Sequence, residues 1–133
     1  MISLTQAKKA AELAQEKAKE LGVNISIAIV DTAGILVLAH KMDDAITISP
    51  KFAYTKAFTS ASIGMPSKDL APYDVPGKPY YGVHTIFGGT LTTIAGGQPI
   101  MMNGKLVGAI GIGGSTDVSQ DDACATAGLA AFV

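Results

Sequence analysis

The sequence predicts a single α+β domain over residues 1–133, with an antiparallel five-stranded sheet flanked by helices in the order α-ββ-α-βββ-α. Three observations predict this class. The chain has the length of one domain. Two β-hairpin patterns are separated and flanked by helical patterns. No strand–helix–strand alternation is present, so the strands are expected to pair antiparallel.

The N-terminal segment, residues 3–21, has the pattern of an amphipathic helix. Ser3 and Gln6 have the spacing of a capping box, in which each side chain satisfies a backbone N–H of the first turn. Gly22 follows the last turn, where glycine takes the left-handed conformation that ends many helices. One stripe is mostly alanine, so we expect it to pack closely on a sheet. The stripe consists of Leu4, Ala7, Ala11, Ala14, Ala18 and Leu21.

The first hairpin is predicted from residues 23–31 and 34–42, which are rich in β-branched and aliphatic side chains. The two runs meet at the short loop Asp31-Thr-Ala-Gly34, which glycine closes. We therefore expect two adjacent antiparallel strands here.

A second helix is predicted over residues 48–64, with Ser49 as its cap, Pro50 in the first turn and Gly64 at its end. Lys56 lies in this largely apolar helix. Its ammonium group either reaches solvent along its aliphatic stem or serves a site.

An irregular segment follows the second helix and contains four prolines and three tyrosines. Long irregular segments in compact domains are usually functional or disordered, and an interface is a further option. Residues 84–97 then have weak strand or bent-strand character. The prolines are Pro66, Pro72, Pro76 and Pro79, and the tyrosines are Tyr73, Tyr80 and Tyr81.

The second hairpin is predicted over residues 99–114, turning at Asn103-Gly104, which is the strongest short turn signal in the chain. The C-terminal segment, residues 119–133, predicts a helix with Ser119 and Asp122 at its cap. Acidic side chains in its first turn suit the positive end of the helix dipole.

The composition excludes several classes of partner. The net charge is −1 and all ten cationic residues are lysine, so no basic patch favours a nucleic acid. No apolar run reaches the roughly 20 residues of a membrane helix. A single cysteine and the absence of a signal-peptide pattern favour a cytoplasmic location. Because 48% of the residues are hydrophobic and only 16% are charged, we expect a homo-oligomer.

The glycine-rich tail of the second hairpin matches no nucleotide-binding motif. It has neither the P-loop spacing nor G-x-G-x-x-G, and its strand belongs to a hairpin rather than a βαβ unit. Two interpretations remain open. The glycines let a helix lie close to the strand, or Gly113-Gly114-Ser115 leads to a helix N-terminus that binds an anion.

Few side chains are candidates for catalysis or metal binding. Neither His40 nor His84 has the spacing of a zinc site, and His84 is the better candidate because it follows the tyrosine-rich segment. Of the adjacent Asp43 and Asp44, one is expected to turn the chain and the other to face a pocket. Cys124 lies among alanines, which predicts a buried, unreactive thiol.

An ordered set of short motifs resembles the GlcG/HbpS-like family, also called the haem-degrading domain family, over nearly the whole chain. The C-terminal domain of PduO-type corrinoid adenosyltransferases is similar. No single motif is specific, but their order and spacing are. The motifs are Ile27-Ala-Ile-Val-Asp31-Thr-Ala-Gly34, Lys41-Met-Asp43-x-Ala45, Lys56-Ala57, Gly96-Gly97-x-Pro99, Asn103-Gly104, Gly108-Ala-Ile-Gly111-x-Gly113-Gly114 and Gln120-Asp121.

The resemblance implies a profilin-like or PAS-like fold and oligomers from dimer to octamer. It implies haem or a related tetrapyrrole or corrinoid as ligand, or a role in glycolate or diol catabolism. A histidine of the first helix is the implied haem ligand in a PduO-type member, but Ser3 to Leu21 contains none. The family's Arg-Met-Asp-Gly-Ala is Lys41-Met-Asp43-Asp44-Ala45 here, which removes the arginine and changes the turn.

We therefore expect a small-ligand-binding module whose pocket lies between the Lys41 strand end, Lys56 and the two glycine turns, with residues 73–84 as a lid. The rival prediction is an enzyme acting on a small hydroxy or oxo acid, with Asp43 or His84 carrying the proton and Lys56 as electrostatic partner. A third possibility is an assembly partner in a catabolic complex. The predicted ligand-binding residues are Lys41, Met42, Asp43, Lys56, His84, Gly96, Gly97, Gly113, Gly114 and Ser115.

Overall fold

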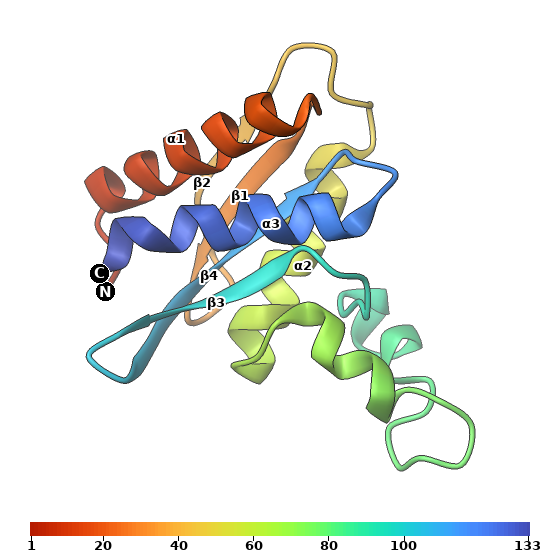
Figure 1. Ribbon diagram of the computed structural model, residues 1–133. Helices are drawn as coiled ribbons and strands as arrows, with labels where there is room; N and C mark the ends of the chain where they lie inside the picture. The colour runs from red at the N-terminus through yellow and green to blue at the C-terminus, as the bar shows by residue number, and fades with distance from the viewer.

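A computed structural model describes residues 1–133 as one sheet with helices on both faces (Figure 1). α1 and α3 lie side by side over one face, and α2 covers the other. Its helices and strands are α1 (Leu4–Leu21), β1 (Ser26–Asp31), β2 (Leu36–Lys41), α2 (Ser49–Ile63), β3 (Gly97–Met102), β4 (Lys105–Gly113) and α3 (Val118–Gly128). Short 3₁₀ turns are η1 (Ser67–Tyr73), η2 (Val83–Thr85), η3 (Phe87–Gly89) and η4 (Leu129–Phe132).

The sheet has four strands in the order β2-β1-β4-β3, all antiparallel to their neighbours. The α+β class, the antiparallel pairing and both hairpins are confirmed, but the predicted fifth strand is wrong. The two central strands, β1 and β4, join the hairpins through the pairs Ser26–Gly113 and Asp31–Gly108. The last strand thus returns beside the first, which brings the two hairpins into one sheet.

The segment predicted as the additional strand forms the turns η2 and η3 instead. Its backbone bends at Phe87, Gly88 and Gly89, which have φ values of 55°, 71° and 73°. These left-handed angles are incompatible with an extended strand. The β-branched side chains around them gave a strand signal that the glycine pair overrides.

Two different cores lie on the two faces of the sheet. The face under α1 and α3 is filled mainly by isoleucines of the strands and by the predicted alanine stripe of α1. The hydrophobic cluster under α2 consists of small side chains: Ala28, Val30, Ala53, Ala57, Ala61 and Ala109. Because these side chains are short, α2 must lie very close to the sheet.

Glycines of the sheet make this close approach possible. A Cβ atom on Gly111 would lie 2.0 Å from the Ala53 carbonyl oxygen, and one on Gly113 would lie 2.6 Å from the Ser49 carbonyl oxygen. Both distances are below any real contact, so only glycine fits. The geometry confirms the close-packing interpretation of these glycines.

The helix caps follow the predictions in part. Ser3 and Gln6 form the predicted capping box, and Gly22 takes the left-handed conformation at the end of α1. Ser49 does not cap α2; its hydroxyl is buried and bonds the Ser26 hydroxyl at 2.8 Å. Ser119 does not cap α3 either, because the Asp117 carboxylate accepts from the Ser119 N–H. In both cases the true cap lies earlier in the chain than predicted.

None of the helices is both long enough and apolar enough to cross a membrane.

Candidate functional site

One end of the sheet gathers most of the predicted ligand-binding residues. The strand pairing places Lys41 opposite Ser26, Ser26 opposite Gly113, and the start of β3 at Gly97 beside β4. The Gly96 carbonyl accepts a hydrogen bond from the Ile112 N–H at 2.9 Å. The pairs Gly96-Gly97 and Gly113-Gly114 therefore lie near each other, at the same end of the sheet as the last residue of β2.

A polar cavity of about 580 Å³ opens at the end of β2. Lys41, Met42 and Asp43 line it, and Lys19 of α1 and His40 add cationic or titratable side chains. The other lining residues are Gln15, Asn24, Ala39 and Asp44. Its lining can bind a small polar or anionic group, but it offers little apolar surface.

Asp44 has φ of 65°, the left-handed conformation that the family's glycine favours. Asp44 thus keeps a glycine-like turn, which aspartate tolerates better than most residues. It also lines a second cavity of about 250 Å³ together with Gly114, Ser115 and Thr116. Asn24 and Asp44 border both cavities, so the two are neighbours.

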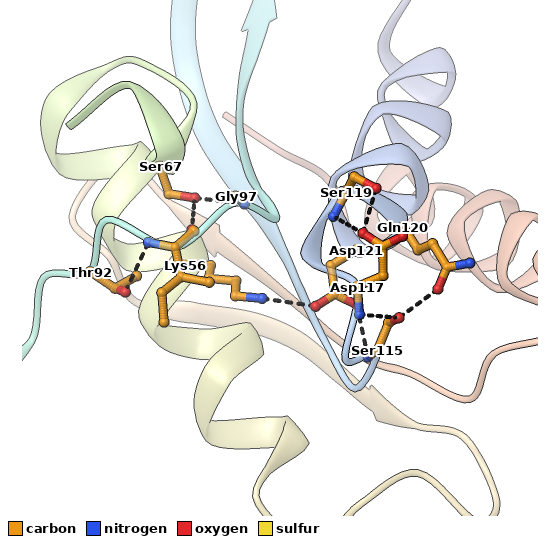
Figure 2. A network of polar contacts seen from close by, with 10 residues as sticks. Lys56, Ser67, Thr92, Gly97, Ser115, Asp117, Ser119, Gln120 and Asp121 are labelled. Carbon is orange, nitrogen blue, oxygen red and sulfur yellow. Dashed lines mark hydrogen bonds and ion pairs between the residues drawn. The ribbon is translucent and has the colours of Figure 1, made fainter. Parts of the chain in front are cut away.

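Lys56 forms a fully buried ion pair with Asp121, as Figure 2 shows. Lys56 Nζ lies 2.9 Å from Asp121 Oδ2, and the two side chains are 2% and 1% exposed. The other carboxylate oxygen accepts from the Ser115 N–H at 3.1 Å. The ammonium group also lies 5.8 Å from the centre of the Phe52 ring, within range of a cation–π contact.

Burial shifts both partners toward their neutral forms. It lowers the pKa of Lys56, although Asp121 acts to raise it. It raises the pKa of Asp121, against the attraction and the hydrogen bond of Lys56. Because the Lys56 side chain is 2% exposed, its ammonium group does not reach solvent. A contact between Lys56 and a ligand stays a prediction that requires the pair to separate.

Gly96 and Gly97 leave room for Lys56. A Cβ atom on Gly96 would lie 2.9 Å from Lys56 Nζ, and one on Gly97 would lie 2.3 Å from the Lys56 carbonyl oxygen. Gly97 also donates its N–H to the Ser67 hydroxyl at 2.9 Å. These glycines thus accommodate α2 and its lysine, and the close contacts leave no open cradle over them.

His84 lies on the irregular segment after α2, which extends away from the sheet (Figure 1). Its Nδ1 pairs with Asp74 Oδ2, and Asp74 Oδ1 accepts from the Gly82 N–H at 2.6 Å. The Asp74 side chain is 2% exposed and that of His84 is 50% exposed. Burial alone would raise the pKa of Asp74, but the hydrogen bonds from His84 and Gly82 outweigh it and lower that pKa.

An apolar cavity of about 300 Å³ lies within the same segment. Tyr73 and Val83, the residues just before Asp74 and His84, line it. Tyr73 also meets Tyr80 edge to face, with ring centres 6.4 Å apart. The remaining lining residues are Ile63, Met65, Leu70 and Leu91. This cavity shares no lining residue with the polar cavity, and a lid over the Lys41 end stays a prediction.

The sequence did not predict the acidic partners of Lys56 and His84. The sequence places Asp121 in the Gln120-Asp121 motif and in the first turn of a helix but does not pair it with Lys56, and no pattern marks Asp74. A lysine on an apolar helix signals a buried acid, but the chain has 11 acidic residues and no local pattern selects one. Cys124 was identified correctly: it is buried, and burial raises the pKa of its thiol to about 11.

Comparison with known proteins identifies close relatives. The model of a family described as haem degrading protein HbpS-like matches residues 2–130. An uncharacterized 15.0 kDa protein of Citrobacter freundii, from the dhaT-dhaS intergenic region, is 33% identical over 98% of this chain and 92% of its own. The corrinoid adenosyltransferase PduO of Salmonella typhimurium is 32% identical over 90% of this chain, which spans only 35% of that protein. The crystal structure of a PduOC:heme complex has a TM-score of 0.92 and 30% identity, covering 98% of this chain and 94% of that one.

Proposed function

This chain belongs to the family of HbpS-like haem-degrading proteins, and from that premise we propose that it is a binding module for a haem-type tetrapyrrole. The resemblance inferred from its motifs is thereby confirmed. The observation that carries the proposal is the likeness to the PduOC:heme complex along nearly the full length of both chains.

The side chains of this protein suit such a ligand. His40 and Met42 at the polar cavity, and His84 on the segment that contributes to the apolar cavity, carry nitrogen or sulfur atoms that bind iron. The apolar cavity offers tyrosine and aliphatic side chains for the faces of a planar ring. Bound haem would supply an iron centre for ligand binding or electron transfer. The protein's residues would hold the ring, supply an axial ligand and exclude water.

The proposal predicts that purified protein binds hemin. In a titration of the protein with hemin, we expect a saturable shift and sharpening of the Soret band, because a protein nitrogen replaces water on the iron. A matched titration of heat-unfolded protein controls for nonspecific partition. An unchanged Soret band in the folded protein would contradict the proposal.

The alternative prediction, an enzyme acting on a small hydroxy or oxo acid, would use the polar cavity, where Lys19 and Lys41 can attract a carboxylate. A thermal-shift screen with such acids separates the two functions. Stabilisation by an acid that is lost in Lys41→Ala, without any effect of hemin, would favour the enzyme.

A further inference from the structure

We propose that the polar cavity at the end of β2 binds a small zwitterion of the α-amino acid class. Lys19 and Lys41 receive the carboxylate of this ligand, and Asp43 and Asp44 receive its ammonium group. The inference goes beyond the proposed function and does not depend on it, because it concerns a ligand of a different chemical class from a tetrapyrrole.

The charged side chains of this cavity are balanced in number and unpaired. Two lysines and two aspartates line it, so their formal charges sum to zero. None of the four ion pairs of the chain includes a lining residue, so the lysines and the aspartates share one cavity without contacting each other. Opposite charges arranged in this way are complementary to a ligand that itself carries both signs of charge.

Backbone contacts fix the chain segment that carries three of these four charges. Met42 is tied to the segment after α1 in two ways: its N–H donates to the Ile25 carbonyl at 2.9 Å, and its sulfur accepts from the Ile25 N–H at 3.4 Å. The Ala45 N–H donates to the Met42 carbonyl at 3.1 Å and closes a turn with Asp43 and Asp44 at its centre. Because this backbone is held before a ligand binds, less order has to be gained on binding.

The lining favours a zwitterion over a simple acid. A hydroxy or oxo acid carries only negative charge, so the two aspartates repel it while the two lysines attract it. An α-amino acid gains attraction from both pairs. The amide side chains of Gln15 and Asn24 add hydrogen-bonding groups, and only two of the nine lining residues are hydrophobic, which favours a polar amino acid.

The backbone at Asp44 is consistent with a role for its carboxylate. Asp44 has φ of 65°, a conformation in which glycine is less strained. A carboxylate at this position therefore has a conformational cost, and its attraction for an ammonium group gives a physical reason for its presence.

The first test measures thermal unfolding of the protein at rising concentrations of L-serine, a small polar amino acid. A ligand that binds only the folded protein raises the Tm in a saturable manner. The quadruple variant K19Q/K41Q/D43N/D44N keeps only the general stabilisation that amino acids exert as solutes. We expect a rise in the Tm of the wild type that exceeds that of the quadruple variant at every concentration.

The second test matches each charge of the ligand with a pair of charges in the cavity. L-Glycerate has a hydroxyl group in place of the ammonium group of L-serine, and 2-aminoethanol lacks its carboxylate. The wild type is expected to bind L-serine about fivefold or more tightly than either, which is the effect of about one exposed ion pair. The variant D43N/D44N should lose the preference over L-glycerate only, and K19Q/K41Q the preference over 2-aminoethanol only.

Matched controls make the same charge changes outside the cavity. Lys9→Gln alters an exposed lysine of α1, and Asp69→Asn alters an exposed aspartate of η1. Both are expected to bind L-serine as the wild type does. The lining charges form no ion pair within the chain, so their variants should fold, and circular dichroism checks this.

Three results would overturn the inference. They are equal stabilisation of the wild type and the quadruple variant by L-serine, tighter binding of L-glycerate than of L-serine, and a preference for L-serine that both double variants keep. The second of these would favour the enzyme that acts on an acid. The hemin titration tests the proposed function separately, since a hemin spectrum and L-serine binding can each occur without the other.

Discussion

At the scale of single residues, the buried pair of Lys56 and Asp121 dominates the electrostatics of the domain. Neither side chain reaches water, and each has the other as a counter-charge 2.9 Å away. Desolvating two charges offsets much of their attraction, so the pair contributes little net stability and is costly to break. It links α2 with α3, two helices that cover opposite faces of the sheet (Figures 1 and 2).

This energy balance predicts strong non-additivity. Lys56→Met alone leaves a buried carboxylate without its counter-ion and should lower the free energy of unfolding by about 3–5 kcal/mol. The double variant Lys56→Met/Asp121→Asn should recover most of that loss, since the amide oxygen can still accept from the Ser115 N–H. Urea unfolding of the wild type, both single variants and the double variant measures the cycle. Additive losses would contradict this account.

At the scale of elements, the packing of α2 on β4 is set by the absence of side chains. Alanines of the helix face glycines of the strand, so backbone lies almost against backbone. A larger residue cannot be absorbed by a rotamer change, because the atoms it would meet are main-chain atoms. Close packing against α2 therefore explains three of the glycines that carry the family resemblance, namely Gly97, Gly111 and Gly113.

Gly111→Ala tests this packing. The added methyl group would lie 2.0 Å from the Ala53 carbonyl oxygen, so we expect a loss of about 3 kcal/mol or more in the free energy of unfolding. Gly64→Ala is the matched control, because its Cβ meets nothing within 4 Å and only its left-handed φ of 69° costs about 1 kcal/mol. Chemical unfolding of both variants gives the comparison, and equal losses would refute the packing argument.

At the scale of the whole molecule, apolar side chains remain on the surface of the single chain. Some of them lie on the segment before α2 and on the irregular segment after it. Ile46, Ile48, Ile86 and Phe87 are 51%, 49%, 50% and 68% exposed. Exposed apolar side chains in such number favour contact with further copies, as the composition predicted.

We therefore predict that the protein associates with itself. Light scattering at micromolar concentration should give a mass that is a multiple of the 13.6 kDa chain. Burial of apolar surface between copies is the driving force, so high salt should not dissociate the assembly. A monomeric mass at that concentration would contradict the prediction.

The sequence by itself determined the features that depend on neighbouring residues. The capping box of Ser3 and Gln6, the end of α1 at Gly22 and the turn at Asn103-Gly104 are all in the predicted places, because each depends on local hydrogen bonds or on backbone angles of one or two residues. The antiparallel α+β class followed from the order of the predicted helices and hairpins along the chain. Its motifs also identified the family.

Only the tertiary structure decided what depends on distant partners. Lys56 meets Asp121, 65 residues away, and the pairing of His84 with Asp74 depends on a turn at Gly82 that no pattern had marked. The fifth strand failed because backbone angles at Phe87–Gly89 outweigh strand propensity. For the two ion pairs the physical reason is the same: the choice among 11 acidic residues is made by desolvation and packing in the folded chain, which local sequence does not encode. For the fifth strand, the β-branched side chains and the glycine pair give opposite local signals, and only the folded backbone shows which of them prevails.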